Sequence, residues 1–135
     1  MVYAVIDTNI FVSAFITKNA TASTRRVINS LFAGKIKPLY NDEIIEEYSE
    51  VLHRSKFHLA DKDIQRLLYF IQINGIDSSR FPYDGDMPDE DDRVFYEVAL
   101  SEEDSFLVTG NLKHFPKTPK VVTALQMMEI LDYGE

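Results

Sequence analysis

The sequence alternates short, continuous apolar runs with longer segments in which apolar residues recur at helical spacing. The run Val2–Ile6 is rich in β-branched residues and directly precedes Asp7, and residues 106–109 form a second such run. Runs of this kind are typical of strands buried on both faces of a parallel sheet. Because parallel strands need crossover connections, the alternation predicts an α/β fold, a three-layer α/β/α sandwich around a central parallel sheet with right-handed crossovers.

Apolar periodicity and turn residues predict the remaining elements. Further strands are expected at 37–40 and 120–122, with a weak edge strand within 76–88. Helices are expected at 10–16, from 23 or 24 to Gly34, from 41 or 42 to about 55, at 61–73, after the acidic loop 89–92, and from Thr123 to Leu131. With 135 residues, 45% of them hydrophobic, we expect one domain spanning residues 1–135.

Composition and charge limit the possible functions. The absence of cysteine excludes a disulfide framework, a thiolate metal site and a cysteine nucleophile, and it agrees with an expected cytoplasmic location. The N-terminus lacks the features of a secretory signal, and no apolar run is long enough for a membrane span. The formal net charge of -8 repels a phosphate backbone at long range, so binding of nucleic acid would need cations or a local basic rim.

Two polar residues follow buried strands directly or nearly so. Asp7 ends the first run, and Asn111 comes after Thr109 and Gly110. Ligands of open parallel sheets bind beyond the carboxyl ends of the strands. A carboxylate there loses hydration and needs hydrogen bonds, an opposite charge or a cation. For Asp7 alone, capping of the following helix explains the position equally well, so both interpretations stay open.

A further acidic side chain is expected on the helix that begins near residue 42. Glu47 lies three residues after Ile44 and four before Val51, a spacing that places it on or beside the buried stripe. Taken from this helix alone, the better interpretation is that Glu47 lies at the edge of the stripe and extends into solvent.

The acidic loop before the next helix carries three aspartates in four positions. Asp89, Asp91 and Asp92 lie where the helix dipole and free amides stabilise carboxylates. Three acids exceed what capping requires, and their repulsion favours a nearby cation. Asp92 precedes Phe95 and Ala99 by three and seven residues and so shares their inward face, which ranks it above the other two.

Carboxylates that converge at one sheet edge predict a hard divalent cation, Mg²⁺ or Mn²⁺. Such an ion would activate water and stabilise negative charge on phosphorus, and it would offset the acidity that otherwise repels RNA. A net-negative chain can therefore still be a nuclease.

Four segments together resemble the PIN-domain family, most closely its branch of small toxins from bacterial and archaeal toxin–antitoxin pairs. The resemblance covers nearly the whole chain, and its segments are Asp7-Thr8-Asn9, residues 47–52, residues 88–93 with Ala99, and residues 107–116. It implies a PIN-like fold and Mg²⁺- or Mn²⁺-dependent hydrolysis of RNA. It also implies frequent dimerisation and, for the toxin branch, an antitoxin protein that fills the site.

The resemblance also implies roles for individual residues. The catalytic positions match Asp7, Glu47, Asp92 and Asn111, and the first three of these would bind the metal. Supporting positions match Thr8, Asn9, Thr109, Asp89 and Asp91.

The chain departs from the family pattern at Asn111, where many members carry aspartate. The amide removes one negative charge, but its carbonyl oxygen can still ligate a metal or orient water. We interpret the site as altered and active, with a catalytically inactive module that binds RNA or a protein as the alternative.

Other enzyme classes fit less well. Phosphoryl transfer through an aspartyl phosphate wants a second acid at position 9, which is Asn, and no Gly-rich phosphate loop is present. The three histidines show no metal-ligand spacing and receive no role.

Overall fold

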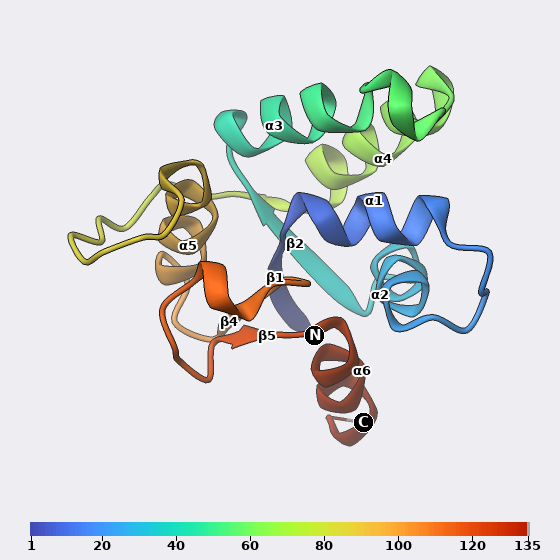
Figure 1. Cartoon of the computed structure of the whole chain (residues 1–135). Helices are drawn as coiled ribbons and strands as arrows, with labels where there is room; N and C mark the ends of the chain where they lie inside the picture. Colours follow the sequence, from blue (N-terminus) through green and yellow to red (C-terminus); the bar gives the residue numbers. More distant parts are fainter. Residues whose placement is uncertain (135) are drawn as a thin grey trace.

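The computed structural model describes residues 1–134, over which the chain forms five strands and six α-helices (Figure 1). The strands are β1 Val2–Ile6, β2 Ile36–Tyr40, β3 Ile76–Asp77, β4 Ser105–Val108 and β5 Val121–Val122. The α-helices are α1 Thr8–Ile16, α2 Ser23–Phe32, α3 Asp42–Leu52, α4 Asp61–Asn74, α5 Arg93–Leu100 and α6 Ala124–Tyr133. Three short 3₁₀ turns are η1 Ser55–Phe57, η2 Glu90–Asp92 and η3 Leu112–His114.

The five strands form one parallel sheet in the order β3-β2-β1-β4-β5. The first strand lies at the centre, as its unbroken apolar sequence predicts. Its neighbour β4 pairs with it in a register that sets Ile6 opposite Val108, and the Asp7 amide donates to the Val108 carbonyl at 2.9 Å. The residues that follow these two strands therefore lie side by side at the same edge of the sheet.

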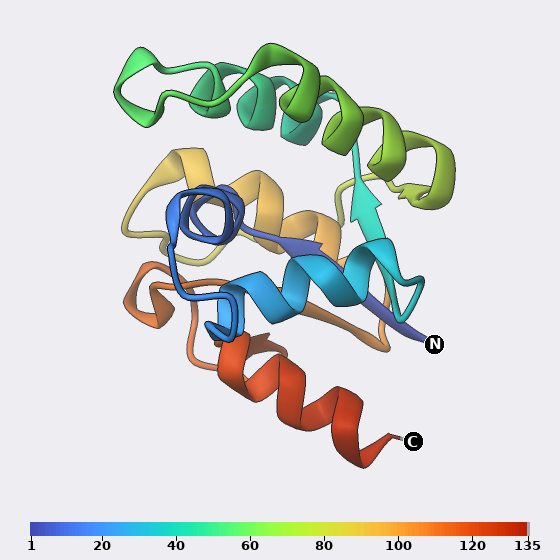
Figure 2. The same cartoon turned by 90° about the vertical axis from the view of Figure 1, so that its right-hand side faces the viewer.

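Helices cover both faces of the sheet, which confirms the predicted three-layer α/β/α fold. Figure 2 shows α3 and α4 on one side and α2 and α6 on the other. Helix α5 packs on β1 and β4 and also contacts α3, and α1 contacts both α2 and α3. The helix that carries Glu47 and the helix that Asp92 directly precedes thus lie next to each other.

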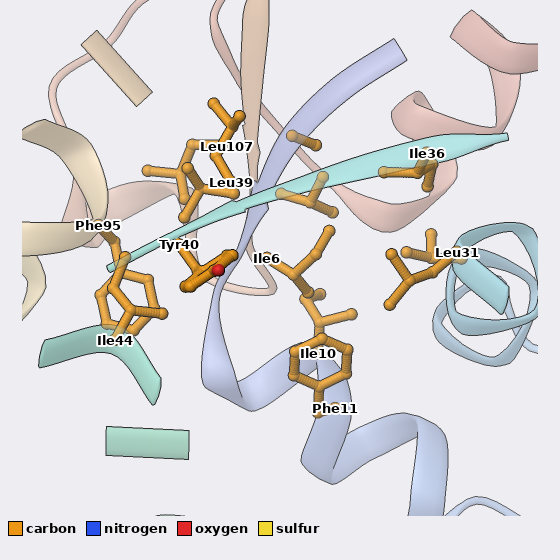
Figure 3. Close-up of a cluster of buried hydrophobic side chains, with 14 of the residues drawn as sticks. Ile6, Ile10, Phe11, Leu31, Ile36, Leu39, Tyr40, Ile44, Phe95 and Leu107 are labelled. Atoms are coloured by element: carbon orange, nitrogen blue, oxygen red, sulfur yellow. The ribbon is translucent and has the colours of Figure 1, made fainter. Parts of the chain in front are cut away.

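The apolar core lies between the sheet and these helices (Figure 3). Ile6, Leu107 and Leu39 come from the three central strands and are at most 1% exposed. Phe11 and Phe95 reach the same core from α1 and α5 and are fully buried. Burial of this many apolar side chains is the main source of stability for a chain without disulfides.

Three helix boundaries differ from the prediction by two or three residues, one of them the end of α6, which lies at Tyr133 instead of Leu131. Helix α1 begins at Thr8 instead of Ile10, because the chain turns into the helix directly after β1 with Asp7 at the N-cap position. Helix α3 ends at Leu52 instead of about residue 55, because Arg54 has extended backbone angles and η1 follows. Gly34, predicted to stop α2, has a φ of 82° that favours glycine.

Within residues 1–134, none of the helices is long and apolar enough to cross a bilayer.

Candidate active site

Asp7 lies at the carboxyl end of the central strand and is 5% exposed. Its Oδ2 accepts hydrogen bonds from the Thr109 hydroxyl at 2.7 Å and from the Asn9 amide at 3.2 Å. Although Asp7 occupies the N-cap position of α1, its side chain makes no capping hydrogen bond. The capping interpretation therefore does not account for Asp7, whose carboxylate is instead held from the end of the neighbouring strand.

Thr109 and Asn9 join the ends of β1 and β4. The Thr109 side chain is fully buried, and its hydroxyl donates to Asp7 while accepting from the Asn111 backbone amide at 3.0 Å. The Asn9 side-chain oxygen accepts from the Gly110 backbone amide at 3.2 Å. Both residues thus lie beside the Asp7 carboxylate, where they can support it.

Glu47 lies on α3 and points toward the start of α1. Its Oε2 accepts from the hydroxyl of Thr8, a residue 4% exposed, at 2.5 Å. This bond contradicts the interpretation that Glu47 extends freely into solvent. The Thr8 hydroxyl connects Glu47 to the residue that directly follows Asp7, which explains why a threonine is useful at this position.

Tyr48, the next residue on α3, has a structural role here that the sequence did not reveal. Its hydroxyl donates to the Ile6 carbonyl at 2.5 Å, and its ring packs edge-on against Phe11 with centroids 5.0 Å apart. Burial and the nearby carboxylates of Asp7 and Glu47 raise the pKa of Tyr48 well above its ordinary value. The hydroxyl therefore stays protonated and fixes α3 to the end of β1.

Of the three aspartates in the acidic loop, Asp92 is the one turned inward. Its side chain is 15% exposed and lies 3.5 Å from the His114 Nδ1. Asp89 caps the loop, accepting from the Asp91 amide at 3.0 Å, and both of these residues are exposed. The ranking of Asp92 above its neighbours agrees with this arrangement.

Asn111 lies beyond the end of β4, where the resemblance placed the fourth position. Its side-chain nitrogen lies 2.9 Å from the Nε2 of His114. His114 is the residue that sequence reasoning missed, since it was given no role although it contacts both Asn111 and Asp92.

Asp7, Glu47 and Asp92, hereafter the acidic cluster, come close enough to perturb one another. Burial raises the pKa of Asp7, against hydrogen bonds from Thr109 and other donors that lower it. Burial and then repulsion by Asp7 raise the pKa of Glu47, while its bond with Thr8 lowers it. Burial, followed by repulsion from Asp7, raises the pKa of Asp92 from 3.8 to about 7. The acids therefore converge, as the sequence predicted.

The donors of the acidic cluster fit a hard divalent ion that retains several waters. In the described residues, no three acidic or histidine side chains are already arranged to hold one ion directly. Mg²⁺ commonly binds one or two carboxylates and completes its shell with water and substrate oxygens. Across residues 1–134 no lysine or arginine forms an ion pair with the cluster. The negative charge of the acidic cluster is therefore not neutralised by a lysine or arginine of the described residues.

A broad apolar hollow of about 1140 Å³ lies elsewhere, between η3, β5 and α6, and is lined in part by Leu112, Val121 and Ile130. It contains none of the acidic cluster. The interacting ionisable and hydrogen-bonding groups lie at the acidic cluster, so the cluster is the better candidate for a functional site although the hollow is large.

The parallel α/β sandwich and its acidic cluster at the carboxyl edge define an α/β protein suited to metal-assisted chemistry. A family model described as PIN domain matches residues 3–113, and the chain belongs to the PIN domain family. The match includes all four catalytic positions expected from the sequence. PIN domains are in general nucleases, and they typically use divalent metal ions. No curated protein matches the chain.

Proposed function

We propose that this protein is a Mg²⁺- or Mn²⁺-dependent endoribonuclease that hydrolyses phosphodiester bonds of RNA at the acidic cluster. The observation that carries the proposal is the arrangement of three carboxylates at one edge of the sheet, with Asp7 buried after β1, Glu47 held by Thr8 and Asp92 turned inward. Burial and repulsion from Asp7 and other acids raise the pKa of Asp92 to about 7. Strongly perturbed groups that face one another are typical of functional sites. Without a lysine or arginine partner among the described residues, these carboxylates favour a divalent cation.

Within this proposal the carboxylates of Asp7 and Asp92 would hold the ion, and Glu47 would bind it through one of its water molecules. When bound, the ion supplies positive charge that stabilises negative charge on the phosphate and on water. Thr109 and Asn9 keep the Asp7 carboxylate in place by donating to its Oδ2. Glu47, held by Thr8, can accept a proton from a water molecule because its second oxygen is not engaged by a hydrogen bond within residues 1–134. Asn111 can orient water or phosphate through its amide.

The test is cleavage of fluorescently labelled single-stranded RNAs of varied sequence by the purified protein with Mn²⁺, Mg²⁺ or EDTA. We expect cleavage with either ion and none with EDTA. Glu47→Gln and Asp7→Asn should each lower the rate at least 100-fold, on the scale of removing one catalytic group. Glu46→Gln is the matched control, because Glu46 is the exposed neighbour on the same helix and should leave the rate unchanged.

The second candidate is a catalytically inactive module that binds RNA or a protein partner. Asn111 favours it, because this residue supplies no negative charge where many family members carry aspartate. Intact RNA in every condition, together with no effect of Mn²⁺ on the unfolding midpoint, would support this module and contradict the nuclease.

The sequence resembles small toxins of toxin–antitoxin pairs, and this resemblance extends the proposal to a cellular role. On this basis the protein acts in the cytoplasm as the toxin, pairs with an antitoxin protein, and forms a homodimer. Induced expression should arrest growth of a bacterial host, and Asp7→Asn should abolish the arrest. Light scattering of the purified protein measures the oligomeric state separately.

A further inference from the structure

His114 bridges two parts of the site that come from different elements. Its Nδ1 lies 3.5 Å from the Asp92 Oδ2 at the start of α5, and its Nε2 lies 2.9 Å from the Asn111 side-chain nitrogen after β4. We propose that His114 is a positioning residue that carries its proton on Nδ1 and holds the Asp92 carboxylate against the end of β4. This role rests on the proposed function, since Asp92 is one of the proposed metal ligands.

The hydrogen-bonding partners determine the tautomer of the imidazole. An amide nitrogen can only donate, so the His114 Nε2 that faces it must accept and carries no proton. A neutral imidazole has one N–H, which is therefore on Nδ1 and faces the Asp92 carboxylate.

The alternative orientation of the amide is disfavoured by Asp92. If the Asn111 oxygen faced His114, Nε2 would donate to it. A neutral ring would then turn the lone pair of Nδ1 toward the Asp92 carboxylate, and the two would repel each other. The contact with Asp92 therefore favours the arrangement in which the Asn111 nitrogen faces Nε2 and the proton is on Nδ1.

The backbone of His114 is well placed for this task. Its amide donates to the Asn111 carbonyl at 3.1 Å, and the next residue, Phe115, is 5% exposed and anchors the end of η3 in the core. Asp92, by contrast, has no side-chain hydrogen bond among residues 1–134, and the contact with His114 is its only ion pair there. His114 is thus the one polar contact that fixes the Asp92 carboxylate within the described chain.

The bridge also explains why an amide suits position 111. An acid at this position could only accept, so it would require the proton of a neutral imidazole on Nε2. The Nδ1 lone pair would then face Asp92. The amide of Asn111 thus suits the His114 tautomer whose proton faces Asp92. Asparagine instead of an acid at position 111 is in this way linked to the placement of the Asp92 carboxylate.

The first test reads the tautomer directly, by ¹⁵N NMR of the imidazoles in metal-free protein in EDTA at pH 9. The chain has three histidines, which single substitutions assign. We expect the neutral His114 ring to carry its proton on Nδ1. His58, whose exposed side chain has no hydrogen bond among the described residues, reports the solvent tautomer. His114 in the state of His58 would overturn the proposal.

An Asp92→Ala variant extends the same measurement. Without the carboxylate the Asn111 amide can present either its nitrogen or its oxygen to Nε2, so we expect His114 to shift toward the tautomer of His58 while His53, at the end of α3, stays unchanged. An unchanged His114 spectrum would contradict the link to Asp92. Neither result depends on metal binding or on nuclease activity, so failure of the bridge and failure of the proposed function can be told apart.

The second test measures Mn²⁺ affinity by electron paramagnetic resonance of the free ion. The amide nitrogen of asparagine mimics Nδ1 and that of glutamine mimics Nε2. We expect His114→Ala and His114→Gln to weaken binding by about 10- to 100-fold, the range for residues that orient metal ligands. His114→Asn should retain affinity within about threefold of the wild type.

Thermal unfolding in EDTA checks that the His114 variants fold. If His114→Asn binds Mn²⁺ as weakly as His114→Ala, or if all three variants bind as well as the wild type, the positioning role is wrong. A wild type that binds no Mn²⁺ contradicts the proposed function, and the NMR measurement then decides the bridge alone.

Discussion

Replacing Asp92 by asparagine measures how far the burial of this carboxylate beside other acids lowers the free energy of unfolding. The side chain keeps its size and can still accept from His114, but it can no longer ionise. Asp92 in the wild type has a pKa of about 7, raised by burial first and by Asp7 next. The folded metal-free protein therefore holds a proton on Asp92 that the unfolded chain releases near the ordinary pKa of 3.8.

The sign and size of the effect follow from proton linkage. Between pH 3.8 and about 7 the folded state binds more protons than the unfolded state, so stability falls as pH rises through this window. At pH 5.5 the solution lies about 1.5 pH units below the pKa of folded Asp92. At about 1.36 kcal/mol per unit this corresponds to about 2 kcal/mol of stabilisation, nearly all of it lost by pH 8.

Urea unfolding in EDTA at pH 5.5 and pH 8.0 measures the free energy of unfolding of the wild type and of Asp92→Asn. Between these two pH values we expect the free energy of unfolding of the wild type to fall by about 2 kcal/mol more than that of the variant. The comparison is needed because His53, whose pKa is raised by its hydrogen bond to Asp61, also loses stabilisation as pH rises through the upper part of the interval. Both proteins contain that pair, so its contribution cancels.

Asp104→Asn is the control, because Asp104 is exposed and precedes β4 at the opposite end of the strand from the cluster. It should show the pH dependence of the wild type. Equal pH dependence in wild type and Asp92→Asn, or a larger loss in the variant, would refute the view that repulsion and burial at Asp92 oppose folding.

Three further substitutions, one of them with a matched control, test how the surrounding elements are held. Arg80→Met should lower the free energy of unfolding in urea by about 3 kcal/mol, because it leaves the Glu97 side chain, which is 8% exposed, without its ion pair. Glu43→Gln removes the exposed partner of Arg80 and should lower it by less than about 0.5 kcal/mol. Tyr48→Phe should cost about 1 kcal/mol by the same assay through loss of the bond to the end of β1, and an unchanged midpoint would argue against that bond. Gly75→Ala places a Cβ 2.5 Å from two backbone carbonyl oxygens, so the thermal midpoint should fall by several degrees, and tolerance of alanine would show that the β2–β3 connection can shift.

The sequence predicts the strand-borne part of the site well because strand ends leave a clear pattern. A continuous β-branched run that stops at Asp7, and a second that stops at Thr109, place these residues at the same edge of any parallel sheet in which the two strands pair. The observed register between β1 and β4 then brings the Thr109 hydroxyl to the Asp7 carboxylate. Helical spacing also placed Asp92 on the inward face, unlike Asp89 and Asp91, because the apolar stripe of α5 is regular.

The parts that sequence reasoning missed depend on short turns and on distant backbone partners. His114 follows Asn111 by three residues, and in a 3₁₀ turn side chains three apart lie above one another. An Asn-x-x-His segment after a buried strand carries that signal, but only if the turn is known to be 3₁₀. The spacing of α3 taken alone favoured a solvent-directed Glu47, because its partner Thr8 lies 39 positions away and no periodicity within the helix can reveal it.

The acidic cluster assembles only when the chain has folded. Asp7 and Thr109 lie 102 positions apart and meet through the pairing of β1 with β4, while Glu47 and Asp92 are brought near them by α3 and α5. In the unfolded chain these carboxylates are separated and hydrated, so their repulsion belongs to the folded state alone. A divalent ion that binds only the folded arrangement stabilises it by mass action, in proportion to the logarithm of its concentration over its dissociation constant. If the proposed ion binds at the cluster, the same convergence that weakens the metal-free protein would make the free energy of unfolding depend on the concentration of the ion.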